Sequence, residues 1–168
     1  ADRDKIPHGL KKLVETVKSE FGVDHFIVWH AISGYWSGLE SRRFRDYDVV
    51  EARRDYGEDL LGVWPVGNEE KWGRLCGLLP PHTVGRFYED FYQILADAGV
   101  DGVKVDNQAL LESVAENLGG RTRLVDAYRS AFETAAEKHF GRWVVNCMCH
   151  NNETFTRMRK SVLMRSSE

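Results

Sequence analysis

The chain has 168 residues, of which 42% are hydrophobic and 29% charged, and its net charge is −3. This length suits one domain able to bury a core, and the composition is that of a soluble globular protein. Because lysine and arginine are scattered among acids instead of forming a basic face, we expect no nucleic-acid partner.

No apolar run approaches the length of a membrane span, and the first residues, "ADRDKIPHGLKK", lack the apolar core of a signal peptide. We therefore expect no membrane partner and a cytoplasmic location, provided that residue 1 is the true start. Cys147 and Cys149 followed by His150 could suggest a metal site, but a second ligand pair at zinc-finger spacing is missing. Buried strand thiols in a reduced compartment are the favoured interpretation.

Helical and extended patterns alternate from the start of the chain. Apolar residues recur at helical spacing between Pro7 and Gly22, which predicts an amphipathic helix. The unbroken apolar run at 26–29 is typical of a strand covered on both faces in a parallel sheet. A second helical stripe at 84–98 stops at Gly99.

The same alternation continues to the end of the chain. "GVKVD" (102–106) predicts a second strand, and an apolar stripe at 124–140 predicts a third helix. "WVVNCMC" (143–149) predicts a third strand, 152–160 a short helix, and "VLMRSSE" (162–168) a fourth strand. Repeated crossover units of this kind predict an α/β fold with a parallel sheet.

Two parallel-sheet architectures fit this order, the doubly wound open sheet and the eight-stranded barrel. Neither "HAISGYW" nor "VDNQALL" has the glycine-rich turn of a nucleotide-binding sheet. The strands carry polar and aromatic residues at their carboxyl ends, which suits the active-site face of a barrel. Four strands make only half a barrel, so either the open sheet is right or the chain is a piece of a larger enzyme.

The connection at about 37–79 is far longer than an ordinary strand-to-helix loop. It contains Trp64 and Trp72 and follows the carboxyl end of a strand. In a barrel it would form a lid or wall of the active site. An insertion with its own small core is the alternative interpretation.

Lys104 and Asp106 interrupt the apolar strand at 102–106. Because side chains alternate along a strand, both should lie on one face, with Val103 and Val105 on the other. A nearby lysine favours the ionised form of a carboxylate, as a nucleophile requires. A purely structural ion pair is the alternative, although burying such a pair contributes little stability.

One carboxylate is not sufficient for cleaving an acetal, because a retaining glycosidase needs a second one to protonate the leaving oxygen. Glu168 ends the only later strand that closes on an acid. Asp101 lies at the opposite end of its strand and is set aside.

Four blocks resemble one known family: "VWHAISGYWSGL", "GLLPPHTVGRFYEDFYQILADAGVDGVKVDNQ", "NCMCHN" and "VLMRSSE". In this order they are similar to the raffinose synthase and seed-imbibition protein group of glycoside hydrolase family 36, which includes alkaline α-galactosidases. The resemblance covers nearly the whole chain, with 41–78 the least similar part. It implies a (β/α)₈ TIM barrel of which residues 1–168 form one central segment, about strands 3 to 6.

The resemblance also implies roles for individual residues. Asp106 would be the nucleophile that attacks the anomeric carbon of an α-galactoside, and Lys104 would contact the sugar hydroxyls. Further residues would bind the substrate from neighbouring strand ends, although for Trp29 a place in the barrel core is an equal alternative. These residues are Trp29, His30, Tyr35, Trp36, Cys147, His150 and Arg165.

The last block departs from the family pattern. Plant relatives read R-A-S-D-D there, and the wider pattern R-x-x-x-D, anchored on Arg165, puts the acid/base aspartate just after residue 168. A register anchored on the first acid selects Glu168 instead. We favour the arginine anchor, which makes Glu168 a neighbour of the acid/base and the segment alone inactive.

The resemblance thus predicts a retaining α-galactosidase that acts through a covalent glycosyl-enzyme. The alternatives are a galactosyltransferase of the raffinose synthase type, which moves galactose from galactinol to sucrose, and an inactive carbohydrate-binding homologue. No cofactor is implied, since cleavage by two carboxylates needs no metal. The expected partner is a galactoside or oligosaccharide.

Overall fold

The computed structural model describes residues 4–54, 75–141, 143–161 and 163–165. At its centre is a parallel sheet in which β4 (Gly102–Asp106) lies between β1 (Ile27–Ala31) and β5 (Val144–Asn146). Beyond β5, Met164 forms a parallel bridge to Asn146. The order of these segments across the sheet is therefore the same as their order along the chain, and the predicted α/β class is confirmed.

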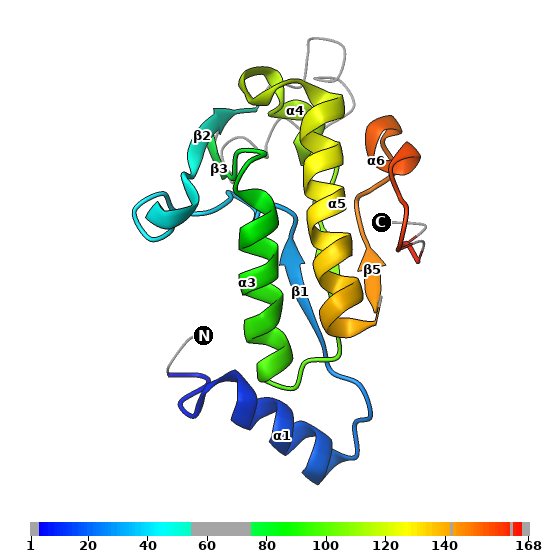
Figure 1. Ribbon diagram of the computed structural model, residues 1–168. Coiled ribbons are helices and arrows are strands. Elements are labelled where there is room, and N and C mark those ends of the chain that lie inside the picture. The colour runs from blue at the N-terminus through cyan, green and yellow to red at the C-terminus, as the bar shows by residue number, and fades with distance from the viewer. Residues whose placement is uncertain (1–3, 55–74, 142, 162, 166–168) are drawn as a thin grey trace, which may run out of the picture.

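Two long helices, α3 (Val84–Asp97) and α5 (Arg121–Phe140), lie side by side over one face of this sheet (Figure 1). The hydrophobic core fills the space between these helices and the sheet. The side chains at its centre are fully buried: Tyr88, Tyr92, Val103, Val105, Leu124, Tyr128 and Phe132. Among the described residues, none of the helices has the length and apolarity that crossing a bilayer requires.

Helix α1 (Gly9–Phe21) lies at the end of the sheet where the strands begin (Figure 1). Nζ of Lys18 is 2.6 Å from an oxygen of Asp101, which also accepts a hydrogen bond from the backbone N–H of Phe26. Asp101 thereby joins α1 to the starts of β1 and β4. The helix ends where Gly22 adopts the left-handed conformation, as the sequence predicts.

The strand predicted at 143–149 is shorter than expected, and the one predicted at 162–168 is described only in part. Of the range 143–149 only Val144–Asn146 is extended, because the backbone of Met148 is left-handed (φ 48°) and turns the chain out of the sheet. Of the range 162–168 the structure describes 163–165, where only the bridge at Met164 continues the sheet.

Three short helices follow the carboxyl ends of β4 and β5. These are α4 (Leu110–Ser113), η3 (Glu116–Leu118) and α6 (Asn152–Thr156). The predicted helix at 152–160 is thus confirmed, but only over its first turn.

The long connection contains structure that the sequence pattern did not predict. A short helix, η1 (Arg45–Tyr47), precedes an antiparallel pair formed by β2 (Val50–Arg53) and β3 (Leu75–Leu78). Ala52, Cys76 and Leu78 are buried in the same cluster as the main core. In its described part, the connection therefore packs onto the main core and does not form a separate one. Trp64 and Trp72 lie outside the described residues.

Candidate functional site

The carboxyl end of β4 presents the lysine and carboxylate that the alternation predicts. Nζ of Lys104 lies 4.0 Å from Oδ2 of Asp106, and Val103 and Val105 point to the opposite, helix-covered face. The lysine side chain is one-third exposed, whereas that of Asp106 is 8% exposed. The prediction that the two charges are neighbours on one face is confirmed.

Both oxygens of Asp106 accept hydrogen bonds from fixed donors. The indole Nε1–H of Trp29 donates to Oδ2 at 2.8 Å, and the backbone N–H of Asn107 donates to Oδ1 at 2.7 Å. The backbone of Asn107 is left-handed (φ 56°) and turns the chain directly after β4. These two contacts hold the carboxylate in one orientation, and each oxygen keeps a second lone pair for another contact.

Aromatic rings surround the indole that contacts Asp106. The ring centroids of Trp29 and Tyr35 are 6.0 Å apart in an edge-on arrangement, and those of Trp29 and Trp36 are 5.6 Å apart. Trp29 and Tyr35 are 38% and 59% exposed. Such exposed rings beside a carboxylate can cover the apolar face of a sugar.

The main-chain carbonyl of Trp36 accepts a hydrogen bond from a residue that directly follows β2. The guanidinium of Arg54, directly after β2, donates to it at 2.5 Å. Arg54 is itself buried. The long connection therefore orients the loop that carries Tyr35 and Trp36, which the sequence pattern did not reveal.

His30 does not lie with the other predicted site residues. It is adjacent to Trp29 in β1 and so points to the opposite face, where it is 3% exposed among Tyr88, Phe91 and Tyr92 of α3. The prediction that His30 lines the same pocket as Trp29 is wrong, because adjacent strand residues cannot share a face.

The partners of His30 define its protonation. The carbonyl of Ala31 can only accept, so Nδ1 of His30 carries the hydrogen (2.8 Å), and Nε2 accepts from the hydroxyl of Tyr92 (2.9 Å). Burial lowers the pKa of His30 from 6.5 to about 4, outweighing the hydrogen bond to Ala31. The imidazole is a neutral link between sheet and helix.

This low pKa gives a testable pH dependence of stability. Between pH 6.5 and 4 the unfolded chain binds a proton at His30 that the folded chain does not, so stability is lost as pH falls through this range. The full-length protein should lose about 3 kcal/mol of unfolding free energy from this group. Urea unfolding at several pH values should show a weaker pH dependence for His30→Gln. Equal pH dependence in both proteins would contradict the assignment.

Cys147 and Arg165 lie beside the site on the two neighbouring segments of the sheet. Cys147 directly follows β5, and Arg165 directly follows Met164. The amide of Cys147 donates to the carbonyl of Val105 at 2.9 Å, and the thiol is fully buried. The guanidinium of Arg165 lies 4.0 Å from Sγ of Cys147. Because Asn146 and Met164 are the paired residues, Cys147 and Arg165 alternate onto the face that carries Asp106.

Two predicted site residues, His150 and Glu168, have no contact with Asp106 that the structure describes. His150 is exposed and follows the turn at Met148, and Glu168 lies outside the described residues. All three cysteines are buried thiols. Within the described ranges, no three His, Cys, Asp or Glu side chains gather in a way that could hold a metal ion.

Three buried polar residues next to the site were missed by the sequence analysis: Gln108, Arg129 and Asn146. A signal existed for Arg129, which lies four residues after Val125 and three before Phe132 on the buried stripe of α5. A charge at such a position is unusual and indicates a buried polar contact.

The fold and this geometry define an α/β protein with a carboxylate site at the ends of parallel strands. The chain belongs to the family described as raffinose synthase or seed imbibition protein Sip1, whose sequence model matches residues 1–168. This confirms the resemblance of the four sequence blocks.

Curated relatives of the chain carry names of galactosyl-transferring enzymes. Over 167 residues the chain is 35% identical to the Arabidopsis thaliana protein named probable galactinol–sucrose galactosyltransferase 6, a match that covers 95% of the chain and 21% of the relative. Over 156 residues it is 36% identical to the galactinol–sucrose galactosyltransferase of Pisum sativum, covering 88% and 19%.

A stachyose synthase of Pisum sativum is 30% identical over 168 residues, covering 95% of the chain and 19% of that protein. The chain thus spans about a fifth of the length of these relatives.

Proposed function

We propose that the chain supplies the nucleophile and part of the sugar pocket of a retaining enzyme that transfers galactose from an α-galactoside. The observation that carries this proposal is the Asp106 carboxylate at the end of β4, held by Trp29 and the Asn107 amide beside Lys104. The sequence analysis gave hydrolysis as its main interpretation and transfer to sucrose as an alternative. The names of the relatives favour transfer.

The proposed reaction has two displacement steps. An oxygen of Asp106 forms a bond to the anomeric carbon while the glycosidic bond breaks, and the leaving oxygen takes a proton from an acid at the strand position that follows β5. An acceptor hydroxyl then attacks the same carbon, Asp106 leaves, and the hydroxyl proton goes to that acid, now acting as the base. The family resemblance, anchored on Arg165, predicts this acid just after residue 168.

We further propose that the parallel sheet is part of a (β/α)₈ barrel. Across a doubly wound sheet the strand order reverses at a switch point, whereas here the strands follow chain order. On the face without helices, Ile27 and Leu163 are 40% and 62% exposed. In a barrel these apolar side chains would pack in its interior against the remaining strands. The cytoplasmic location stays a prediction.

The substrate assignment can be tested with the full-length protein. Incubation with galactinol, with and without sucrose, should give a galactosylated sucrose only when sucrose is present. Release of free galactose at the same rate in both mixtures would favour a hydrolase. Binding of galactinol without any product would favour a homologue that has lost catalysis. The Asp106→Asn variant serves as the blank.

The hydrogen bond from Trp29 to Asp106 should contribute directly to turnover. A hydrogen bond to a charged group contributes about 1.5–3 kcal/mol, so Trp29→Phe should lower kcat about 10- to 100-fold while keeping an aromatic ring. Trp143→Phe is the matched control, because Trp143 is half-exposed and precedes β5 at the opposite end of the sheet. If both variants keep kcat within about twofold of the wild type, the contact has no role in turnover.

A further inference from the structure

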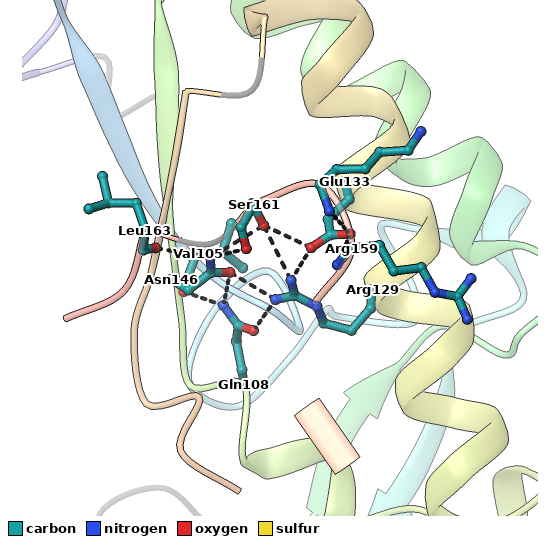
Figure 2. A network of polar contacts seen from close by, with 9 residues as sticks. Val105, Gln108, Arg129, Glu133, Asn146, Arg159, Ser161 and Leu163 are labelled. Atoms are coloured by element: carbon teal, nitrogen blue, oxygen red, sulfur yellow. Dashed lines mark hydrogen bonds and ion pairs between the residues drawn. The ribbon is translucent and has the colours of Figure 1, made fainter. Parts of the chain in front are cut away.

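A buried polar network lies behind the strand ends, on the helix side of the sheet (Figure 2). Its centre is Arg129 of α5, which is 1% exposed. Its guanidinium forms an ion pair with Glu133, one turn later on the same helix. The network also reaches β4, β5 and the segment that leads to Met164. Of the described strand positions beside the candidate site, it leaves out β1.

One guanidinium nitrogen joins the ends of β4 and β5. Nη1 of Arg129 donates to the side-chain oxygens of Gln108 at 2.7 Å and Asn146 at 2.8 Å (Figure 2). The amide of Gln108 donates in turn to the carbonyl of Val105 and to Asn146, each at 2.9 Å. Since Gln108 is two residues after Asp106, these bonds fix the turn that follows the nucleophile.

The other guanidinium nitrogen holds the segment after α6. Nη2 of Arg129 donates to the hydroxyl of Ser161 at 3.2 Å, and that hydroxyl donates to Glu133 at 2.8 Å. The second oxygen of Glu133 accepts the backbone N–H groups of Arg159 and Lys160 at 3.2 and 3.1 Å.

Asn146 holds the same segment from the sheet. Its amide donates to the carbonyls of Ser161 at 3.2 Å and Leu163 at 3.0 Å. The segment that enters the last strand position is therefore fixed from both the helix and the sheet before it reaches Arg165.

Stability alone is a weak explanation for this network. A buried ion pair can often be replaced by apolar residues without loss of stability, because desolvation of the charges offsets their attraction. Within the described part of the chain, Nε of Arg129 is buried without an acceptor, which adds a further cost. A largely satisfied network does, however, impose one relative arrangement on the segments that it joins.

We propose that Arg129 is a positioning residue that sets the spacing between the Asp106 strand end and the segment at 163–165 beyond β5, which leads to the acid/base. This inference rests on the proposed function. A retaining enzyme needs its two carboxyl groups about 5–5.5 Å apart, and a misplacement of about 1 Å can lower the rate about 100-fold. Within the described residues Arg129 does not contact Asp106, and it acts through Gln108, Asn146 and Ser161.

The test is Arg129→Lys in the full-length enzyme, which keeps the charge but loses the forked geometry. Two donors are compared, an alkyl α-galactoside, whose leaving oxygen needs protonation, and 4-nitrophenyl α-galactoside, whose leaving group needs little. Misplacement of the acid should lower kcat/KM, which reports the first displacement, about 10- to 100-fold for the alkyl donor and less than about threefold for the nitrophenyl donor.

Ser161→Ala provides a milder variant that removes only the hydroxyl's bonds to Arg129, Glu133 and Asn146. It should show the same dependence on the leaving group, at about 3- to 10-fold. Arg159→Met is the matched control, because its side chain forms an exposed ion pair with Asp126 outside the buried network. It should leave both rates unchanged.

Rates are expressed per active site, titrated with a slow mechanism-based galactosyl fluoride, so that unfolded enzyme is not counted. If Arg129→Lys and Ser161→Ala lower the melting temperature but keep the wild-type ratio of the two rates, the network is only structural and the inference is overturned. If the wild-type enzyme transfers galactose from neither donor, the proposed function itself fails, and the inference fails with it.

Discussion

Replacing Asp106 by asparagine in the full-length enzyme is expected to lower kcat about 10⁴-fold or more, because an amide oxygen cannot form the glycosyl ester. The change is nearly isosteric. The amide oxygen can still accept from Trp29 or from the Asn107 amide, so folding and sugar binding should be largely retained. Steady-state rates with galactinol and sucrose, together with calorimetric binding of the donor, measure both effects.

Asp101→Asn is the matched control for this variant. Asp101 immediately precedes the same strand at its other end, where it pairs with Lys18 of α1. Its replacement should lower the melting temperature but leave kcat of the folded enzyme near the wild-type value. Wild-type turnover in Asp106→Asn would refute the nucleophile assignment.

Replacing Lys104 by methionine should lower kcat/KM about 100-fold, mainly through a higher KM. The ammonium is one-third exposed and 4.0 Å from Asp106, so it is accessible to a bound sugar as well as to the carboxylate. Its contacts to sugar hydroxyls would form with the bound substrate and persist in the transition state, and such uniform binding is expressed in KM. Steady-state kinetics at varied donor concentration separate the two constants.

Lys138→Met provides the control for loss of a lysine charge. Lys138 forms an exposed ion pair with Glu89 across the α3–α5 contact, on the outside of the molecule. Exposed pairs of this kind contribute little, so kinetics and stability should both stay near the wild type. If Lys104→Met behaves like this control, Lys104 has no part in binding the sugar.

The alternation of helices and strands could be predicted because its signals are local. Helical apolar stripes and the glycines at 22, 99 and 141 mark where helices end, and each of these glycines has a positive φ. The pair β2 and β3 could not be found in this way. Its strands are four residues each, lack a clear alternation and pair across more than twenty residues of sequence, so no local pattern reports them.

The site shows the same division between local and long-range information. The shared face of Lys104 and Asp106 follows from alternation within one strand. The bond from Trp29 to Asp106 depends instead on the register between β1 and β4, which aligns Trp29 with Lys104. Alternation of side chains along β1 also puts His30 and Trp29 on opposite faces of the sheet. The resemblance of the block that contains "VWHA" instead implies one pocket for both residues, and this implication is wrong.

The most direct test of this account is to trap the proposed covalent intermediate. A slow-reacting fluorinated α-galactosyl fluoride should label the full-length enzyme once, and digestion followed by mass spectrometry should place the sugar on Asp106. Asp106→Asn should remain unlabelled under the same conditions. A sugar attached to any other residue, or equal labelling of the asparagine variant, would contradict the assignment of Asp106 as the nucleophile.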